Sequence, residues 1–160
     1  MRHTRFTFVV LMLAAVSALA ADKPSFTGTW EMNKGQSDFG QMSSQTVPDK
    51  LTQKITQKGD AELRAESTTV GARGTASTDM KYKLDGSEST NKNQMGEVKS
   101  VAKWDGNHIA ITSKREVQGM SIGLSEKWEV SADGKVMTVN RTMTGTPMGD
   151  IVTKMVFDKQ

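Results

Sequence analysis

The 160-residue chain contains no cysteine and only two histidines. Without cysteine, disulfides, thiol catalysis, iron–sulfur clusters and cysteine-ligated zinc are excluded. His3 lies in an N-terminal segment that we expect to be removed, so His108 would be the single histidine of the mature chain. We therefore predict no metal site and no cofactor.

Residues 1–20 have the parts of a signal peptide. Arg2 and Arg5 precede an apolar stretch, and Ala18-Leu19-Ala20 provides the small-x-small pattern of a cleavage site. The apolar stretch is shorter than the roughly 20 residues that span a bilayer. We predict export to the periplasm or the medium and one mature domain over residues 21–160.

The mature chain has almost no excess of positive charge. The whole chain carries 21 basic and 18 acidic side chains, and removal of Arg2 and Arg5 leaves 19 basic ones. The sequence pI of about 9.2 therefore belongs largely to the removed segment. With no surplus charge to neutralise phosphates, nucleic-acid binding is not expected.

From Lys50 onward, apolar and polar residues alternate with a period of two, and no stretch has a convincing helical period. The pattern predicts about ten strands, at 26–32, 49–57, 61–69, 76–84, 87–91, 96–104, 107–117, 120–131, 135–144 and 150–158. Closure removes exposed edges from such a meander. We therefore predict an all-β fold, a single antiparallel up-and-down β-barrel of about 8–10 strands, with a two-sheet sandwich as the alternative. A polar outer face argues against a membrane-spanning barrel.

Turn residues predict which strand positions face each other, because Asp-Gly favours two-residue hairpin loops. The turns considered are Asp85-Gly86, Asp105-Gly106, Gln118-Gly119, Asp133-Gly134 and a three-residue loop at 58–60. The pairs they predict are Lys83 with Glu88, Ala102 with Ile109, Ser100 with Ile111, Glu97 with Lys114, Ile109 with Trp128, Glu126 with Arg141, and Ile55 with Leu63. The predicted partner of His108 is Lys103.

Glu126 and Arg141 fall on the apolar face of this pattern, directly opposite each other. A charged group in apolar surroundings needs a partner, because an unpaired buried charge costs several kcal/mol. Two interpretations stay open: a structural ion pair, or a polar anchor for the head group of a ligand.

Phe26-Thr27-Gly28-Thr29-Trp30 opens the first predicted strand, and Gly-x-Trp in this place resembles the lipocalin and broader calycin superfamily. The run GTW…N…SDFG is similar to small secreted bacterial proteins of lipocalin-like type. The resemblance implies a cup-shaped interior for a small apolar or amphipathic molecule. It also implies a basic residue from a late strand packed across Trp30, for which Arg141 is the candidate. Fatty-acid-binding proteins carry Arg-x-Tyr near the end, where this chain has Arg141-Thr142-Met143, so a fatty-acid carboxylate site is not supported.

The predicted function is binding or carriage of a small hydrophobic or amphipathic ligand by a monomeric barrel. The residues predicted to line the cavity are Ile55, Leu63, Met80, Tyr82, Ile109, Ile111, Leu124, Glu126, Met137, Arg141, Met143 and Met155. The 33–49 segment, with Phe39 and Met42, is a candidate lid.

Two other functions stay open. One is a protein-binding or inhibitor module acting through rim loops, and the other is a barrel enzyme with Glu126 as base. The serine of Gly119-Met120-Ser121-Ile122-Gly123 begins a strand, and the only mature histidine precedes it, so a serine hydrolase is not expected. No catalytic residue is predicted.

Overall fold

The computed structural model describes residues 23–93, 96–117 and 119–160. The predicted signal peptide lies outside these residues. Ten strands follow one another in chain order. Their bounds are β1 Gly28–Met32, β2 Lys50–Lys58, β3 Glu62–Gly71, β4 Gly74–Lys83, β5 Asp85–Asn93, β6 Gly96–Asp105, β7 His108–Val117, β8 Met120–Val130, β9 Val136–Thr144 and β10 Ile151–Lys159. Each predicted strand is present, with its ends shifted by a few residues.

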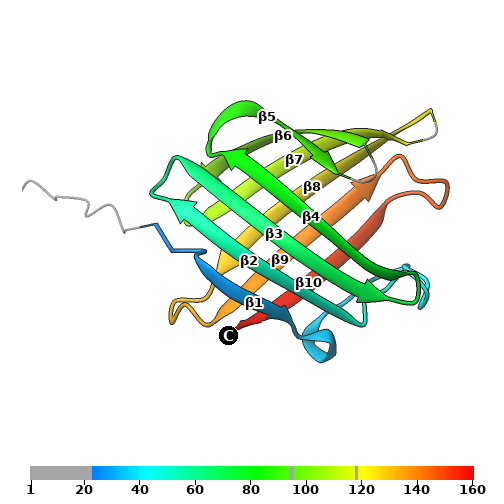
Figure 1. The fold of residues 1–160 in the computed structure, drawn as a ribbon, viewed down its shortest axis with the longest axis horizontal. Coiled ribbons are helices and arrows are strands. Elements are labelled where there is room, and N and C mark those ends of the chain that lie inside the picture. Colours follow the sequence, from blue (N-terminus) through cyan, green and yellow to red (C-terminus); the bar gives the residue numbers. More distant parts are fainter. Residues whose placement is uncertain (1–22, 94–95, 118) are drawn as a thin grey trace, which may run out of the picture.

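The strands form one antiparallel sheet in the order β4-β3-β2-β1-β10-β9-β8-β7-β6-β5. Figure 1 shows this sheet curled on itself, with β1 to β4 crossing in front of β6 to β10. The first and last strands of the order, β4 and β5, come together and nearly close the barrel. The predicted all-β, up-and-down, lipocalin-like fold class is confirmed.

Two of the predicted hairpin registers are confirmed. Glu126 faces Arg141 in the β8–β9 ladder, and Ile109 faces Trp128 in the β7–β8 ladder. The β8–β9 connection is longer than the two residues expected, because β8 ends at Val130 and β9 begins at Val136. The longer loop leaves the pairing unchanged.

Two other registers were wrong by two residues. Ile55 faces Ala65 rather than Leu63, because Lys58 pairs with Glu62 and the loop lies one residue later than expected. In the β6–β7 hairpin, Asp105 pairs with His108, so the turn is Gly106-Asn107, with Gly106 at φ 60°. The observed pairs there, in place of the predicted ones, are Ala102 with Ile111, Ser100 with Ser113, Lys99 with Lys114, Trp104 with Ile109 and Lys103 with Ala110. A shift of two residues keeps every side chain on its predicted face.

The predicted β4–β5 hairpin ladder was also wrong. No backbone pairing joins these strands among the described residues, and Lys83 does not face Glu88 in a ladder. Side chains of β5 hold the backbone of β4 instead. The Lys83 N–H donates to Ser89 Oγ at 3.0 Å, and Asn91 bonds both backbone groups of Lys81. We refer to this side-chain closure, at 81–83 and 89–91, as the seam.

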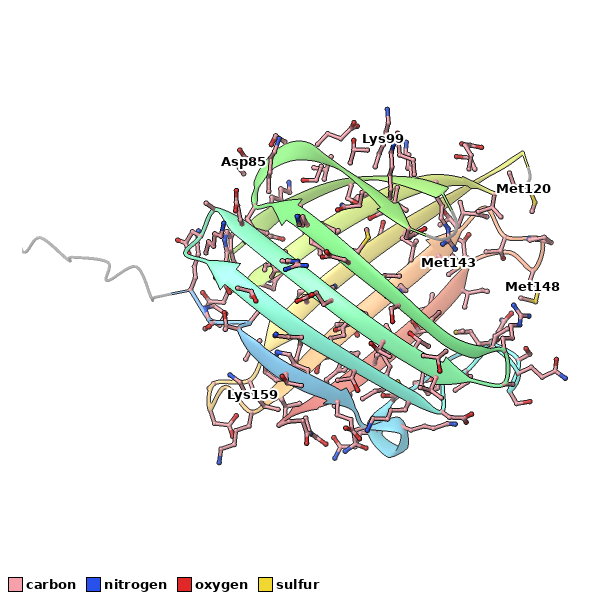
Figure 2. The ribbon with its side chains drawn as sticks, in the orientation of Figure 1. Asp85, Lys99, Met120, Met143, Met148 and Lys159 are labelled. Atoms are coloured by element: carbon pink, nitrogen blue, oxygen red, sulfur yellow. The ribbon has the colours of Figure 1, made fainter. Side chains whose placement is uncertain are left out.

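Apolar side chains fill the end of the barrel at which the loops 59–61, 106–107 and 131–135 lie, and we call this the core end. Trp30, Phe26, Phe157 and Met137 are fully buried there. The Trp30 Nε1–H donates to the Phe26 carbonyl at 2.8 Å, which ties the chain entry to β1. In Figure 2, Asp85 and Lys159 lie toward the left of the view, and Met120, Met143 and Met148 lie on the opposite side.

The basic residue packed across Trp30 is Lys159, so the assignment of this place to Arg141 was wrong. The Lys159 Nζ lies 5.1 Å from the centre of the Trp30 ring. Trp30 faces Lys159 in the β1–β10 ladder, whereas Arg141 faces Thr153 farther along β10. Arg141 is thus several residues from the tryptophan on the same wall.

The 33–49 segment runs alongside β10 before it returns to β2. Asp38 forms an isolated bridge with Lys154, and Ser37 Oγ accepts from the Val156 N–H at 2.9 Å. Phe39 packs against the hydrophobic core cluster. These contacts attach the proposed lid segment to the wall of the barrel.

Candidate functional site

The end of the barrel opposite the core end contains a cavity of about 300 Å³, which we call the inner cavity. Its lining comes from inward-facing positions of β2 to β9. The apolar lining residues are Ala65, Met80, Tyr82, Val98, Leu124, Trp128 and Met143, and the polar ones are Gln53, Ser67, Thr69, Thr78, Asn93, Ser113, Arg115, Glu126 and Arg141. The cavity is therefore amphipathic rather than uniformly apolar.

The predicted lining residues divide into two groups. Met80, Tyr82, Leu124, Glu126, Arg141 and Met143 line the inner cavity. Ile55, Leu63, Ile109, Ile111, Met137 and Met155 are buried members of the hydrophobic core cluster and do not line it. Phe39 and Met42 of the proposed lid do not line it either. The alternation rule identifies inward-facing residues, but it does not show how far along the barrel the packing extends.

Glu126 and Arg141 form an ion pair on the wall of the inner cavity. Two nitrogen atoms of Arg141, Nε and one Nη, lie 2.6 Å from the same oxygen, Glu126 Oε1. The other oxygen, Oε2, accepts from the Trp128 Nε1–H at 3.3 Å. The Glu126 side chain is 7% exposed and that of Arg141 is 31% exposed. The carboxylate is thus buried and satisfied, while the guanidinium still has surface toward the opening.

Tyr82 lies beside this pair. Its ring meets that of Trp128 edge to face, with the ring centres 6.4 Å apart. Burial raises the pKa of the Tyr82 phenol far above its usual range, and the nearby Glu126 carboxylate adds to the rise, while Arg141 opposes it. Tyr82 is therefore a neutral phenol at physiological pH.

Apart from Glu126 and Arg141, sequence reasoning missed the polar lining residues, of which Gln53 is the most informative. Gln53 is 7% exposed, and its Nε2 donates to Ser67 Oγ at 3.2 Å. Its Oε1 is buried and accepts no hydrogen bond from the residues that the structure describes. The signal was present in the alternation pattern, because Gln53 stands between Leu51 and Ile55 at an inward-facing position.

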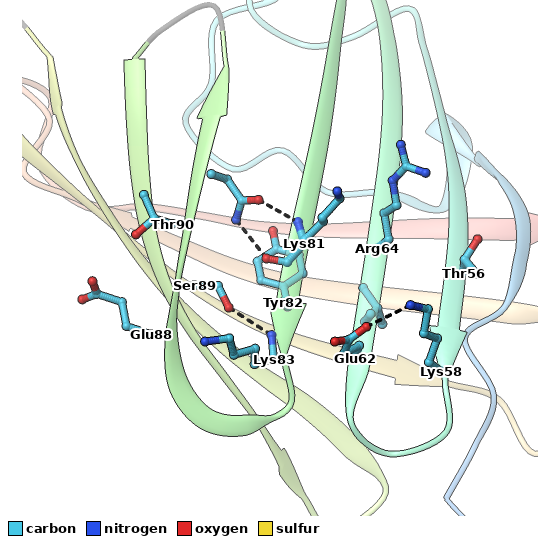
Figure 3. A pocket seen from close by; sticks show the side chains of 12 residues that line it. Thr56, Lys58, Glu62, Arg64, Lys81, Tyr82, Lys83, Glu88, Ser89 and Thr90 are labelled. Atoms are coloured by element: carbon cyan, nitrogen blue, oxygen red, sulfur yellow. Dashed lines mark hydrogen bonds and ion pairs between the residues drawn. The ribbon is translucent and has the colours of Figure 1, made fainter.

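A second hollow lies on the outer surface, over the seam, with a volume of about 720 Å³. Figure 3 shows its lining side chains, which come from β2 to β5 and include Lys58, Arg64, Lys81 and Lys83. Although it is larger than the inner cavity, several of its charged side chains are held in ion pairs at the surface. Lys58 contacts Glu62, and Arg64 holds both oxygens of Asp79. We regard it as the outer face of an imperfectly closed wall.

Neither a metal cluster nor a membrane-spanning helix occurs in the described parts of the chain. They contain no group of three or more histidine, aspartate or glutamate side chains placed to hold a metal ion. The helix that they contain is the single 3-10 turn Lys34–Gln36, which is far too short to cross a bilayer.

The fold is similar to that of several solved structures. Zebrafish ileal bile acid-binding protein, complexed with cholic acid, is 20% identical, with a TM-score of 0.57 over 84% of this chain and 98% of that one. A secretory abundant heat soluble protein from Ramazzottius varieornatus is 20% identical, with a TM-score of 0.59 over 86% and 96% of the two chains. A fatty acid-binding protein from the brain of Drosophila melanogaster is 20% identical, with a TM-score of 0.52 over 84% and 99%.

These similarities establish a calycin-like fold and nothing finer. No protein-family model matches the sequence. No curated protein matches it either.

Proposed function

We propose that this protein binds a small amphipathic molecule inside the barrel. The observation that supports the proposal is the inner cavity, which has both apolar and polar walls in a barrel whose other end is solidly packed. Its volume of about 300 Å³ lies at the lower limit of ordinary ligand pockets. This is the volume that about ten water molecules occupy in liquid water, so the ligand is compact rather than a long acyl chain.

Similar structures support binding in the interior. Zebrafish bile acid-binding protein was solved with cholic acid, and the Drosophila protein is a fatty acid-binding protein. The predicted signal peptide at 1–20 adds the proposal that the barrel is exported and works in the periplasm or the medium. A role in carrying or sequestering the ligand, rather than transforming it, fits the satisfied state of Glu126.

A direct test is to fill the inner cavity with a larger side chain. Leu124 lines the cavity and is partly exposed to it, so Leu124→Trp should occupy the space and abolish binding of a compact probe such as 1-naphthol. Val101→Trp is the matched control, because Val101 lies on the outer face and is 40% exposed. Calorimetric titration should show binding to the wild type and to Val101→Trp, and none to Leu124→Trp. Equal affinity in all three proteins would mean that the probe binds elsewhere.

The rival function, a protein-binding module acting through rim loops, has weaker support. Met148, in the loop after β9, is 63% exposed, and Met120, the first residue of β8, is 38% exposed. Two exposed methionines are ordinary for a protein surface. A rim-binding protein also has no use for an amphipathic cavity.

A further inference from the structure

We propose that Gln53 selects the ligand of the inner cavity, and that the ligand is a compact uncharged molecule that donates a hydrogen bond to Gln53 Oε1 from an O–H or N–H group. This inference rests on the proposed function and adds the chemical class of the ligand. A ring system with a hydroxyl or an aromatic amine group is the kind of molecule that fits.

The side-chain oxygen of Gln53, Oε1, accepts no hydrogen bond from the described residues. A side-chain amide carries two donor hydrogens and one acceptor oxygen. The nitrogen is used by Ser67 on the neighbouring strand, and the backbone of Gln53 belongs to the β1–β2–β3 ladders. The oxygen is buried and has no partner among the described residues, and Gln53 is one of the residues that line the cavity. A buried acceptor without a partner costs free energy, which a donor on the ligand would recover.

The Glu126–Arg141 ion pair argues against an acidic head group beside Arg141. The Glu126 carboxylate lies on the cavity wall and occupies the guanidinium of Arg141 through Oε1. An anionic head group placed beside Arg141 would also lie beside the negative charge of Glu126. Arg115 lines the cavity as well and has interactions of its own. An ionised carboxylate also has no hydrogen to donate to Gln53 Oε1, so an uncharged donor is favoured over a carboxylate at that atom.

A second buried oxygen, that of the Thr153 hydroxyl, provides a matched control. Thr153 is 5% exposed, and its Oγ1 also has no partner among the described residues. Thr153 lies on β10, which contributes no residue to the cavity lining. Thr153→Val thus removes an unpartnered buried oxygen of a residue that does not line the inner cavity.

The test compares probes of nearly equal size on three proteins. The probes are 1-naphthol, which donates a hydrogen bond, 1-methylnaphthalene, which does not, and 1-naphthoate, which is anionic. The proteins are the wild type, Gln53→Leu and Thr153→Val. We expect Gln53→Leu to lower the affinity for 1-naphthol, relative to the affinity for 1-methylnaphthalene, by roughly tenfold, because one buried hydrogen bond is lost. Thr153→Val should leave the ratio of these two affinities unchanged.

The outcomes separate the two proposals. An unchanged ratio of affinities in Gln53→Leu would overturn the role of Gln53 while leaving interior binding intact. Tightest binding of 1-naphthoate to the wild type would overturn the preference for an uncharged ligand. Failure of every probe to bind the wild type would instead contradict the proposed function.

Discussion

The side chain of Asn91 takes the place of a neighbouring strand for Lys81. Its Oδ1 accepts from the Lys81 N–H at 2.8 Å, and its Nδ2 donates to the Lys81 carbonyl at 3.0 Å. An antiparallel partner strand would exchange the same two bonds with one residue. A single amide side chain, 7% exposed, thus bridges the edges of the sheet at the seam.

Replacing this amide should weaken the closure of the barrel. Asn91→Ala leaves both backbone groups of Lys81 without their partner, and we expect a loss of about 1–3 kcal/mol in the free energy of unfolding. Urea denaturation measures the loss, and hydrogen exchange should show faster exchange at the Lys81 amide. Thr90→Ala, an exposed change on the same strand, is the control. Identical denaturation midpoints for the two variants would show that the seam does not depend on Asn91.

The ion pair of the inner cavity should be costly to break from one side. Arg141→Met leaves the buried Glu126 carboxylate without its cation, and we expect a loss of about 3 kcal/mol or more. The double variant Arg141→Met with Glu126→Leu should recover most of the loss, because no charge then stays buried. Chemical denaturation measures both. A loss near zero for the single variant would mean that the Glu126 carboxylate does not depend on Arg141 as its partner.

Lys159 should stabilise the core end through its contact with Trp30. A cation over an aromatic face contributes about 0.5–1 kcal/mol at an exposed site, so Lys159→Ala should lower the melting temperature modestly. Lys154→Ala, an exposed lysine on the same strand, should have a smaller effect. Tryptophan fluorescence during thermal unfolding provides the readout. Equal changes in melting temperature for the two substitutions would show that the contact between Lys159 and Trp30 does not stabilise the protein.

Tyr82 should make stability fall at high pH. Its pKa is raised in the folded protein, chiefly by burial, so the proton is bound more tightly in the folded state than in the unfolded one. The stabilising contribution is complete below the ordinary tyrosine pKa of about 10 and is lost as the pH rises above it. Because the chain has one tyrosine, its absorbance near 295 nm reports this group alone.

A matched variant separates this effect from the titration of lysines. Tyr82→Phe removes the ionisable group, so its stability should fall less steeply than that of the wild type above about pH 10. Ionisation of Tyr82 at its ordinary pKa in the native protein would contradict the burial of the phenol.

The faces of the strands could be predicted from the sequence alone, because side chains alternate along a strand whatever the strand pairs with. Ile109, Trp128 and Met137 are buried, as the alternation requires. Registers were predictable only where one turn position was favoured. In Asp105-Gly106-Asn107 each residue suits a tight turn, and the structure uses the second and third.

The composition of the inner cavity was not predictable in this way. Ile55 and Met80 both alternate inward, yet Ile55 lies in the packed core and Met80 lines the cavity. The difference depends on which side chains from distant strands meet in the interior. Gln53 shows the same limit, because an inward polar residue is significant only once its surroundings are known.

The sequence by itself determined an antiparallel β meander, its inward and outward faces, and the opposition of Glu126 to Arg141 across one hairpin. These features depend on local geometry and on turns between neighbours in the chain. Tertiary structure decided the packing of Lys159 against Trp30, the closure of the seam by Asn91, and the unpartnered oxygen of Gln53, which is a lining residue of the inner cavity. Such contacts join residues far apart in the chain or depend on how side chains from several strands pack. No local periodicity encodes them.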